Sequence, residues 1–351
     1  MTSASLPPAR GPLSSAVIEG LRGADTLADT DRLRMLVAGC ADPLGDDDLH
    51  LALYLIYELS YRGLVDVDDA MEWDPAVVAC RLALERPFEA ALRIAVPPIP
   101  VAADDVPTGL RTLAREGPGT TSRFLEREAD LETYQEFVIH RSAYHLKEAD
   151  PHSFAIPRLT GAPKVSLVEI QADEYGGGDA SWMHAALFAQ TMRGVGLDDS
   201  YGAYLARIPG STLATVNLMS LFGLHRRLRG ALVGHLAMFE LTSTLPNRRY
   251  GNGLRRLGFD EATTRFFDEH VEADAVHEAI AANDLAGGLA AAEPHLASQI
   301  MFGARALLAL DDRSGEGMLA SWRAGRSSLL PPDREPADVG MHAARGAGRV
   351  A

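Results

Sequence analysis

Apolar residues recur at three- and four-residue spacing along most of the chain, which is the pattern of helices that bury one face. A strand-like run of β-branched residues is found only at 164–172, "KVSLVEIQA", and this run leads into three glycines. We therefore predict an all-α protein. In the longer C-terminal block, helices are expected at 110–117, 122–149, 180–195, 199–206, 211–222, 224–242, 260–283 and 287–311.

A proline-rich segment, "VPPIPVAADDVPTG" at 96–109, divides the helical pattern into two blocks, because proline cannot continue a helix. Residues 16–109 are predicted to form an N-terminal helical extension that ends in this joint. Residues 110–325 are predicted to form the main helical bundle. The ends, 1–15 and 326–351, are rich in small residues and proline and are expected to be disordered.

Charge and composition exclude several classes of protein. The formal net charge is −15, which argues against binding to nucleic acid or to an anionic membrane surface. Two cysteines leave no disulfide framework and no cysteine-based zinc site. No apolar run is long enough to span a membrane, and the N-terminus lacks the apolar segment of a secretory signal. We expect a cytoplasmic protein.

Candidate chemistry begins with "FFDEHVEADAVHEAI" at 266–280. His270 and His277 are seven residues apart, which on a helix is a difference of only about 20° in direction. Asp274 lies between them and falls on the same stripe. Taken alone, such a stripe is more often a solvated helix face than a metal site.

Other carboxylates and a histidine stand where a helix would normally be apolar. Glu148 lies near the end of a long expected helix, and Glu240 is surrounded by apolar residues. Glu174 and His184 are ten residues apart, so an unbroken helix would point them about 80° away from each other. The glycines at 176–178 permit the distortion that would bring both side chains to one point.

Helical bundles build di-iron sites from inward-facing Glu and His on several helices. Carboxylate and imidazole ligands suit iron or manganese, and four carboxylates would neutralise two divalent ions. Simpler interpretations remain open for each residue: Glu240 is also explained as a partner of Arg248 or Arg249, and His184 as a core histidine. Asp173, next to Glu174, is a candidate for orienting a histidine ligand.

Four motifs in combination, "YHLKEADPHSFAIPRLTG", "DEYGGG" with a following His, "GHLAMFE" and "DEHVEADAVHE", resemble the haem-oxygenase-like di-iron oxidase superfamily of iron-containing redox enzymes. Within it, the chain most resembles the branch of amino-acid N-oxygenases, over about 125–325. The resemblance implies a haem-oxygenase-like bundle and an N-terminal extension that supports a homodimer. It also implies the metal ligands Glu148, Glu174, His184, Glu240, His270, Asp274 and His277.

The function implied by this resemblance is that of a non-haem di-iron oxygenase, with two iron ions, O₂ as co-substrate and an external reductant that the sequence does not identify. The expected substrate is a small-molecule amine or amino acid, N-oxygenated to a hydroxylamine or nitro product in natural-product biosynthesis. An alternative in the same class is cleavage or desaturation of C–C bonds of an amino or fatty acid. An alternative of another class is a non-catalytic helical iron-binding or scaffold protein.

Overall fold

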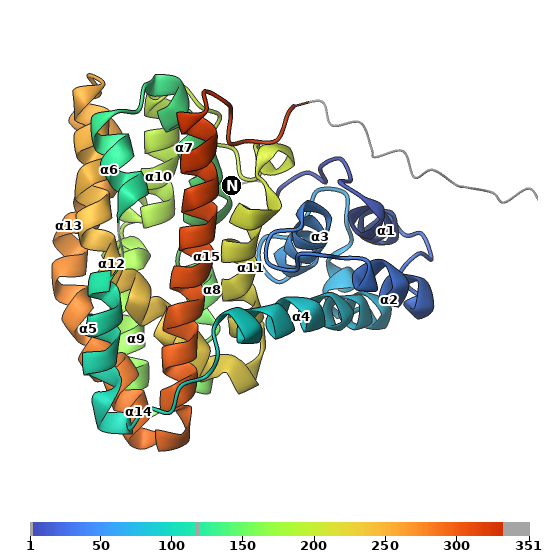
Figure 1. Ribbon diagram of the computed structural model, residues 1–351, viewed down its shortest axis with the longest axis horizontal. Coiled ribbons are helices and arrows are strands. Elements are labelled where there is room, and N and C mark those ends of the chain that lie inside the picture. The colour runs from blue at the N-terminus through green and yellow to red at the C-terminus, as the bar shows by residue number, and fades with distance from the viewer. Residues whose placement is uncertain (1–2, 117–118, 333–351) are drawn as a thin grey trace, which may run out of the picture.

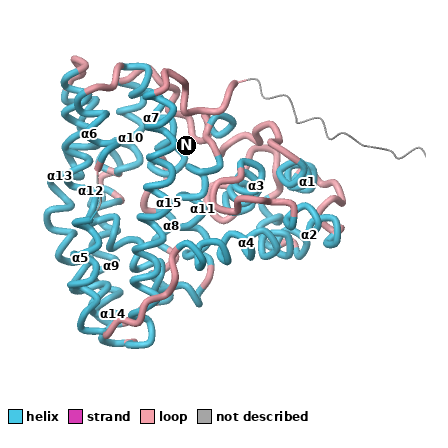
Figure 2. Tube along the Cα trace, viewed as in Figure 1, coloured by secondary structure: helices cyan, strands magenta, loops and turns pink. Residues whose placement is uncertain are grey.

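The computed structural model describes residues 3–116 and 119–332, apart from the side chains of Thr30, Asp274 and Ala275. Within this part of the chain the regular structure is helical, and no strand is drawn (Figure 2). The predicted all-α class is therefore confirmed. No helix among the described residues combines the length and the apolar character that crossing a membrane requires.

The N-terminal block lies to one side of a bundle of long helices (Figure 1). Its helices are α1 (Pro12–Leu21), α2 (Thr30–Ala38), α3 (Asp47–Glu58) and α4 (Pro75–Ala95). Aspartate caps start three of these helices; for α3, the Asp46 side chain accepts hydrogen bonds from the backbone N–H groups of Asp48 and Leu49. Helix α3 is buried along almost its whole length because it lies between the other N-terminal helices and the bundle.

The bundle begins at α5 and continues to the end of α15. Its helices are α5 (Val106–Glu116), α6 (Thr120–Arg127), α7 (Leu131–His145), α8 (Asp150–Ser153), α9 (Gly161–Glu174), α10 (His184–Gly194), α11 (Gly210–Leu224), α12 (Arg229–Arg256), α13 (Glu261–Ala279), the π-helix η8 (Ile280–Gly287), α14 (Gly288–Ala292) and α15 (Ala297–Arg323). The connections between these helices also contain short 3-10 helices: η1 (Asp69–Trp73), η2 (Ala103–Asp105), η3 (Ile156–Arg158), η4 (Gly176–Gly178), η5 (Ala180–Trp182), η6 (Leu205–Arg207), η7 (Arg226–Leu228) and η9 (Pro294–Leu296). Helix α12 is central, with α13, α15 and α6 packed around it (Figure 1).

Two glycines let the long helices α12 and α15 touch backbone to backbone. A Cβ atom added to Gly234 would lie 1.8 Å from the carbonyl oxygen of Ile300, and one added to Gly303 would lie 1.9 Å from that of Ala231. Neither distance leaves room for a methyl group, so this crossing requires glycine on both helices.

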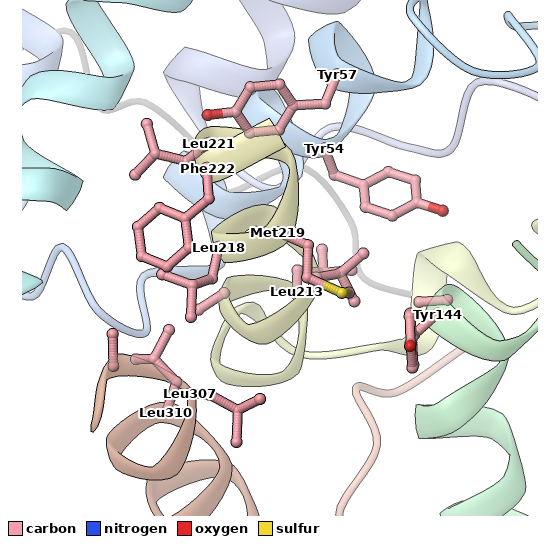
Figure 3. Close-up of a cluster of buried hydrophobic side chains, with 14 of the residues drawn as sticks. Tyr54, Tyr57, Tyr144, Leu213, Leu218, Met219, Leu221, Phe222, Leu307 and Leu310 are labelled. Carbon is pink, nitrogen blue, oxygen red and sulfur yellow. The ribbon is translucent and has the colours of Figure 1, made fainter. Parts of the chain in front are cut away.

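Helix α11 joins the two blocks. Its apolar side chains lie between the tyrosines of α3 and the leucines of α15 (Figure 3). A buried ion pair adds to this apolar contact: Lys147 Nζ lies 2.6 Å from Glu58 Oε2, and both side chains are almost completely buried. The N-terminal block is therefore attached to the bundle by both apolar packing and a paired charge.

Several predicted elements are wrong in detail. The strand candidate 164–172 lies inside helix α9, and the single helix expected at 122–149 is divided into α6 and α7. The division occurs where Asp130 caps the start of α7 by accepting a hydrogen bond from Thr133 N–H. Of the segment 199–206, expected to be helical, only Leu205 and Ala206 are helical, as part of the 3-10 helix η6, and the residues before them form a bend and turns.

Disorder was predicted too widely at both ends. Within 1–15, α1 begins at Pro12 and the Ala4 side chain is fully buried, so this prediction is wrong for residues 3–15. Within 326–351, the backbone N–H of Leu330 donates to the carbonyl of Arg207, and Leu329 is buried. The remainder of that tail, 333–351, lies outside the described residues.

Candidate metal centre

Five segments of the bundle bring the predicted ligands together. Glu148 lies in the turn that follows α7, Glu174 is the last residue of α9, and His184 is the first residue of α10. Glu240 is on α12, and α13 carries the remaining candidates. The six predicted ligands whose side chains are described, Glu148, Glu174, His184, Glu240, His270 and His277, are all buried. The side chain of the seventh, Asp274, lies outside the described residues.

The first cluster consists of Glu148, His184 and His270, whose ligand atoms lie within 4.8 Å of one another. His270 is oriented by its own helix, since its Nδ1 lies 2.8 Å from the carbonyl oxygen of Phe266 and donates a hydrogen bond to it. Nε2 is the ring nitrogen that faces the cluster, and it lies 3.4 Å from Glu148 Oε1. The ring of His270 is therefore oriented as a metal ligand needs to be.

The second cluster consists of Glu174, Glu240 and His277, again with ligand atoms within 4.8 Å of one another. His277 Nε2 lies 3.0 Å from Asp173 Oδ2, which is the orienting role predicted for this aspartate. The other ring nitrogen, Nδ1, faces Glu240 Oε2 at 3.4 Å. A histidine held by a carboxylate on one side and open on the other is a common arrangement around protein-bound metals.

The oxygen and nitrogen atoms that could bind metal are arranged so that two cations would fit among them. Five buried atoms of the clusters have no hydrogen-bond partner: Glu148 Oε2, Glu174 Oε2, Glu240 Oε2, His184 Nδ1 and His277 Nδ1. Glu174 Oε2 and His184 Nδ1 are only 2.9 Å apart, yet their geometry is not that of a hydrogen bond. Buried polar atoms without partners are costly, and a shared cation removes that cost. The two clusters, which meet at this contact, therefore fit a pair of metal ions.

Electrostatics in the site favour added positive charge. Burial and the nearby Glu174 carboxylate raise the pKa of Glu240 above its ordinary value. Burial alone would lower the pKa of His277, but Glu240 and Asp173 raise it to about 9. For Glu148, burial would raise the pKa, but the imidazoles of His145 and His270 hold it well below its ordinary value. Glu240 and Glu174 thus repel each other in a buried space, while Glu148 and His277 depend on partners of opposite charge, and divalent cations would compensate the remaining negative charge.

The glycine run produces the distortion that its sequence predicts. Gly176, Gly177 and Gly178 all have positive φ, so the chain leaves α9 and returns into α10 over a tight turn. A Cβ atom on Gly176 would lie 2.6 Å from the backbone nitrogen of Met183, so that position has no room for a side chain. This turn places the last residue of α9 beside the first residue of α10.

Sequence reasoning missed three histidines near the clusters. His145 Nδ1 lies 2.7 Å from Glu148 Oε1, a contact that their three-residue spacing could have indicated. His152 and His235 form a buried pair, with Nε2 of the first 3.1 Å from Nδ1 of the second. No spacing rule connects residues on two separate helices, so the sequence carried no signal for this pair.

A cavity of about 710 Å³ adjoins both clusters. Its walls combine apolar side chains, among them Leu218, Met219, Leu236 and Phe239, with polar and charged ones. The volume is in the range of small-molecule sites in proteins.

A model of the family described as iron-containing redox enzymes matches residues 135–312, just over half of the chain. The chain belongs to this family. The match includes all seven predicted ligand positions, and it makes the protein an iron-containing oxidoreductase. The superfamily inferred from the motifs is thus confirmed.

The chain is also similar in sequence to a characterised protein. Nitrosourea synthase from Streptomyces achromogenes subsp. streptozoticus is 29% identical over 132 residues, which are 38% of this chain and 28% of the relative. The chain therefore aligns with less than a third of that relative's length.

Proposed function

We propose that the protein is an O₂-dependent non-haem di-iron oxygenase that inserts oxygen at the nitrogen of an amine, most simply an amino acid or its derivative. The observation that supports this most strongly is the pair of buried carboxylate–histidine clusters that share one cavity. A single bound metal ion would leave the negative charge of the other cluster uncompensated. The family and the similarity to a nitrosourea synthase support redox chemistry at nitrogen.

In this proposal the clusters Glu148–His184–His270 and Glu174–Glu240–His277 hold the two irons, and Asp274 completes the set. The irons, when bound, would supply coordination positions for O₂ and the electrons for one turnover, and an external reductant would return them to the ferrous state. The chain's own contribution is orientation and exclusion of water. Phe266 and Asp173 hold the two histidines of α13, and the apolar side chains of the cavity wall, such as Leu236 and Phe239, would limit the access of water.

The test starts from metal-free protein reconstituted with Fe(II) under nitrogen. We expect close to two iron ions per chain, O₂ uptake that depends on an added amine or amino acid, and a product that has gained oxygen on nitrogen. Iron would be measured by elemental analysis, O₂ by electrode and the product by mass spectrometry. Glu240→Ala should remove uptake and lower the iron content, whereas Glu272→Gln, on an exposed position of the same helix as the histidines, should change neither.

Other results would favour the alternatives. A product with a shortened or unsaturated carbon chain would indicate a C–C bond oxidase. Iron that binds without any amine-dependent O₂ uptake would indicate a non-catalytic iron-binding protein. Failure of the full chain to bind iron at all would overturn the proposal.

A further inference from the structure

Glu148 lies in a turn whose backbone is anchored on both sides of it. On one side, the Lys147 side chain is fixed by the buried ion pair with Glu58 of α3. On the other side, the carbonyl of Ala149 accepts a 2.8 Å hydrogen bond from the side chain of Gln171 on α9. The main chain at Glu148 is therefore tied to two other helices, and rotation of its side chain is the movement that remains to be restricted.

A histidine outside the predicted ligand set contacts the Glu148 carboxylate. His145 is the last residue of α7 and precedes Glu148 by three residues, and its Nδ1–H donates a 2.7 Å hydrogen bond to Glu148 Oε1. The carboxylate of Glu174, in contrast, faces His184, which is itself a predicted ligand. The contact between His145 and Glu148 thus needs an explanation that the ligand set does not provide.

Aromatic rings from two other helices pack against the imidazole of His145. The centre of its ring lies 4.9 Å from that of Phe188 on α10 and 4.9 Å from that of Phe266 on α13. Both phenylalanines are fully buried, and only 13% of the His145 side chain is exposed. Because buried side chains are closely packed, the imidazole cannot turn without displacing its neighbours. The N–H group that faces Glu148 is thus held in one direction.

The two oxygens of Glu148 have different surroundings. Oε1 accepts the hydrogen bond from His145, whereas Oε2 is buried and has no hydrogen-bond partner in the part of the chain that the structure describes. A metal ion in the first cluster would remove the cost of burying Oε2. A carboxylate that binds one ion through both oxygens occupies two coordination positions, and a carboxylate that binds through one oxygen occupies one. Holding Oε1 in a hydrogen bond therefore leaves a coordination position on that ion free.

We propose that His145 is a positioning residue, which holds Glu148 so that this carboxylate binds its metal ion through Oε2 alone. This inference rests on the proposed function, because it assigns His145 a role at one of the two proposed iron sites. His145 acts through Glu148 and does not itself bind the metal. The position that it leaves free on the ion is available to a co-substrate, and His145 and Glu148 both line the cavity through which one would approach.

The test uses Co(II) bound to the full chain and needs no turnover. Metal-free protein is titrated with Co(II) against a competing chelator, and the intensity of the visible absorption per bound ion reports the coordination number. His145→Leu removes the N–H donor and keeps an apolar side chain in its place. It should weaken the binding of one of the two ions by about 10- to 100-fold, because Glu148 is no longer oriented. It should also lower the absorption of that ion, because the released Oε1 adds a second oxygen to it.

Two further variants separate the hydrogen bond from packing. His145→Asn offers an amide N–H close to the position of Nδ1–H, so it should restore most of the affinity and the spectrum of the wild type. His295→Leu is the matched control, since the His295 side chain is 69% exposed, and it should bind Co(II) as the wild type does.

A double-mutant cycle tests whether His145 acts through Glu148. In a Glu148→Gln protein, the additional change His145→Leu should alter neither the affinity for Co(II) nor the spectrum any further. Infrared difference spectra of the wild type with and without Co(II) give a check that needs no change at His145. The two carboxylate stretching bands that Glu148→Gln removes should have the wide spacing of a carboxylate bound through one oxygen.

Three outcomes would overturn the role of His145. The first is a His145→Leu protein with the Co(II) spectrum of the wild type, or a Glu148 band pair with the narrow spacing of a chelating carboxylate. The second is a His145→Asn protein that is changed as much as His145→Leu while the circular dichroism of both matches the wild type. The third is an equal effect of His145→Leu with and without Glu148→Gln. If the variants behave as expected but no amine supports O₂ uptake, the proposed function fails while the role of His145 stands. A wild type that binds no Co(II) and no Fe(II) would overturn both.

Discussion

Replacing Lys147 by methionine should destabilise the protein strongly, because the lysine neutralises a carboxylate that cannot reach water. The Lys147 ammonium lies 2.6 Å from Glu58 Oε2, and Tyr201 donates a 2.6 Å hydrogen bond to the other carboxylate oxygen. The ammonium also lies 4.3 Å and 4.6 Å from the ring centres of Tyr61 and Tyr54. In Lys147→Met, Glu58 would lose its ammonium partner and keep the hydrogen bond from the Tyr201 hydroxyl.

The expected cost follows from this burial. Removing one partner of a buried ion pair typically costs about 3–5 kcal/mol, because the remaining charge is left uncompensated. For a chain of this size the midpoint of urea denaturation should fall by about 1 M or more. Replacing both residues, Lys147→Met with Glu58→Gln, removes the charge and keeps an acceptor for Tyr201. The double variant should therefore be more stable than the single variant by about 2 kcal/mol or more.

The assay is urea denaturation followed by circular dichroism at 222 nm on the wild type, both single variants and the double variant. An exposed pair is the control: Arg34 and Asp31 lie 3.0 Å apart with side chains 70% and 86% exposed, so Arg34→Met should cost about 0.5 kcal/mol or less. A loss of about 1 kcal/mol or less in Lys147→Met, or a double variant as unstable as the sum of its singles, would refute the reasoning.

Three further predictions concern the metal centre, a helix crossing and a buried histidine. Asp173→Asn should weaken iron binding by about 10- to 100-fold, because Asp173 orients His277, a proposed ligand; a Fe(II) titration against a competing chelator measures this, and unchanged affinity would contradict the role. Gly303→Ala should lower the unfolding free energy by about 3 kcal/mol, because its methyl group would overlap a backbone carbonyl of α12. Gly317→Ala, on the same helix with open space around it, should instead raise stability by about 0.5–1 kcal/mol, and equal effects in thermal denaturation would count against the contact. Burial lowers the pKa of His50 to about 4, so its contribution to stability is complete above about pH 6.5 and is lost as the pH falls toward 4. Between pH 7 and 5 this loss is about 2 kcal/mol; His50→Gln should reduce the pH dependence by that amount, and an unchanged slope would exclude the histidine as its source.

The candidate metal ligands could be recognised in the sequence because carboxylates and imidazoles at apolar positions of a helix are unusual. The stripe of His270 and His277 follows from helical periodicity alone, and Glu240 stands out because its neighbours are apolar. Periodicity alone could not show whether the stripe faces solvent or the core. Only the packing of the other helices against α13 shows that both histidines are buried.

Helix limits were predicted less well, because tertiary packing overrides local signals. The segment 164–172 contains the β-branched residues Val165 and Val168, yet both are exposed. Leu167 and Ile170, spaced as on a helix, are the residues that face the core. Local preference favoured a strand, and burial of the helical stripe determined the outcome.

Helix α12 shows the same effect at a proline. It continues to Arg256, beyond its expected end at 242, although Pro246 removes one backbone hydrogen bond. Tyr250 and Leu254 are buried one and two turns further on, so packing against the neighbouring helices outweighs the missing bond.

The turn between α9 and α10 connects the two clusters directly, since Glu174 at its start belongs to one and His184 at its end belongs to the other. Gly176 packs so closely against the backbone of Met183 that the length of this turn determines the distance between Glu174 and His184. Inserting or deleting a residue between Gly176 and Met183 would alter the separation of the two clusters while leaving every carboxylate and imidazole in the protein. Chemistry that depends on that separation could thus be adjusted, in evolution or by design, without substituting any of these side chains.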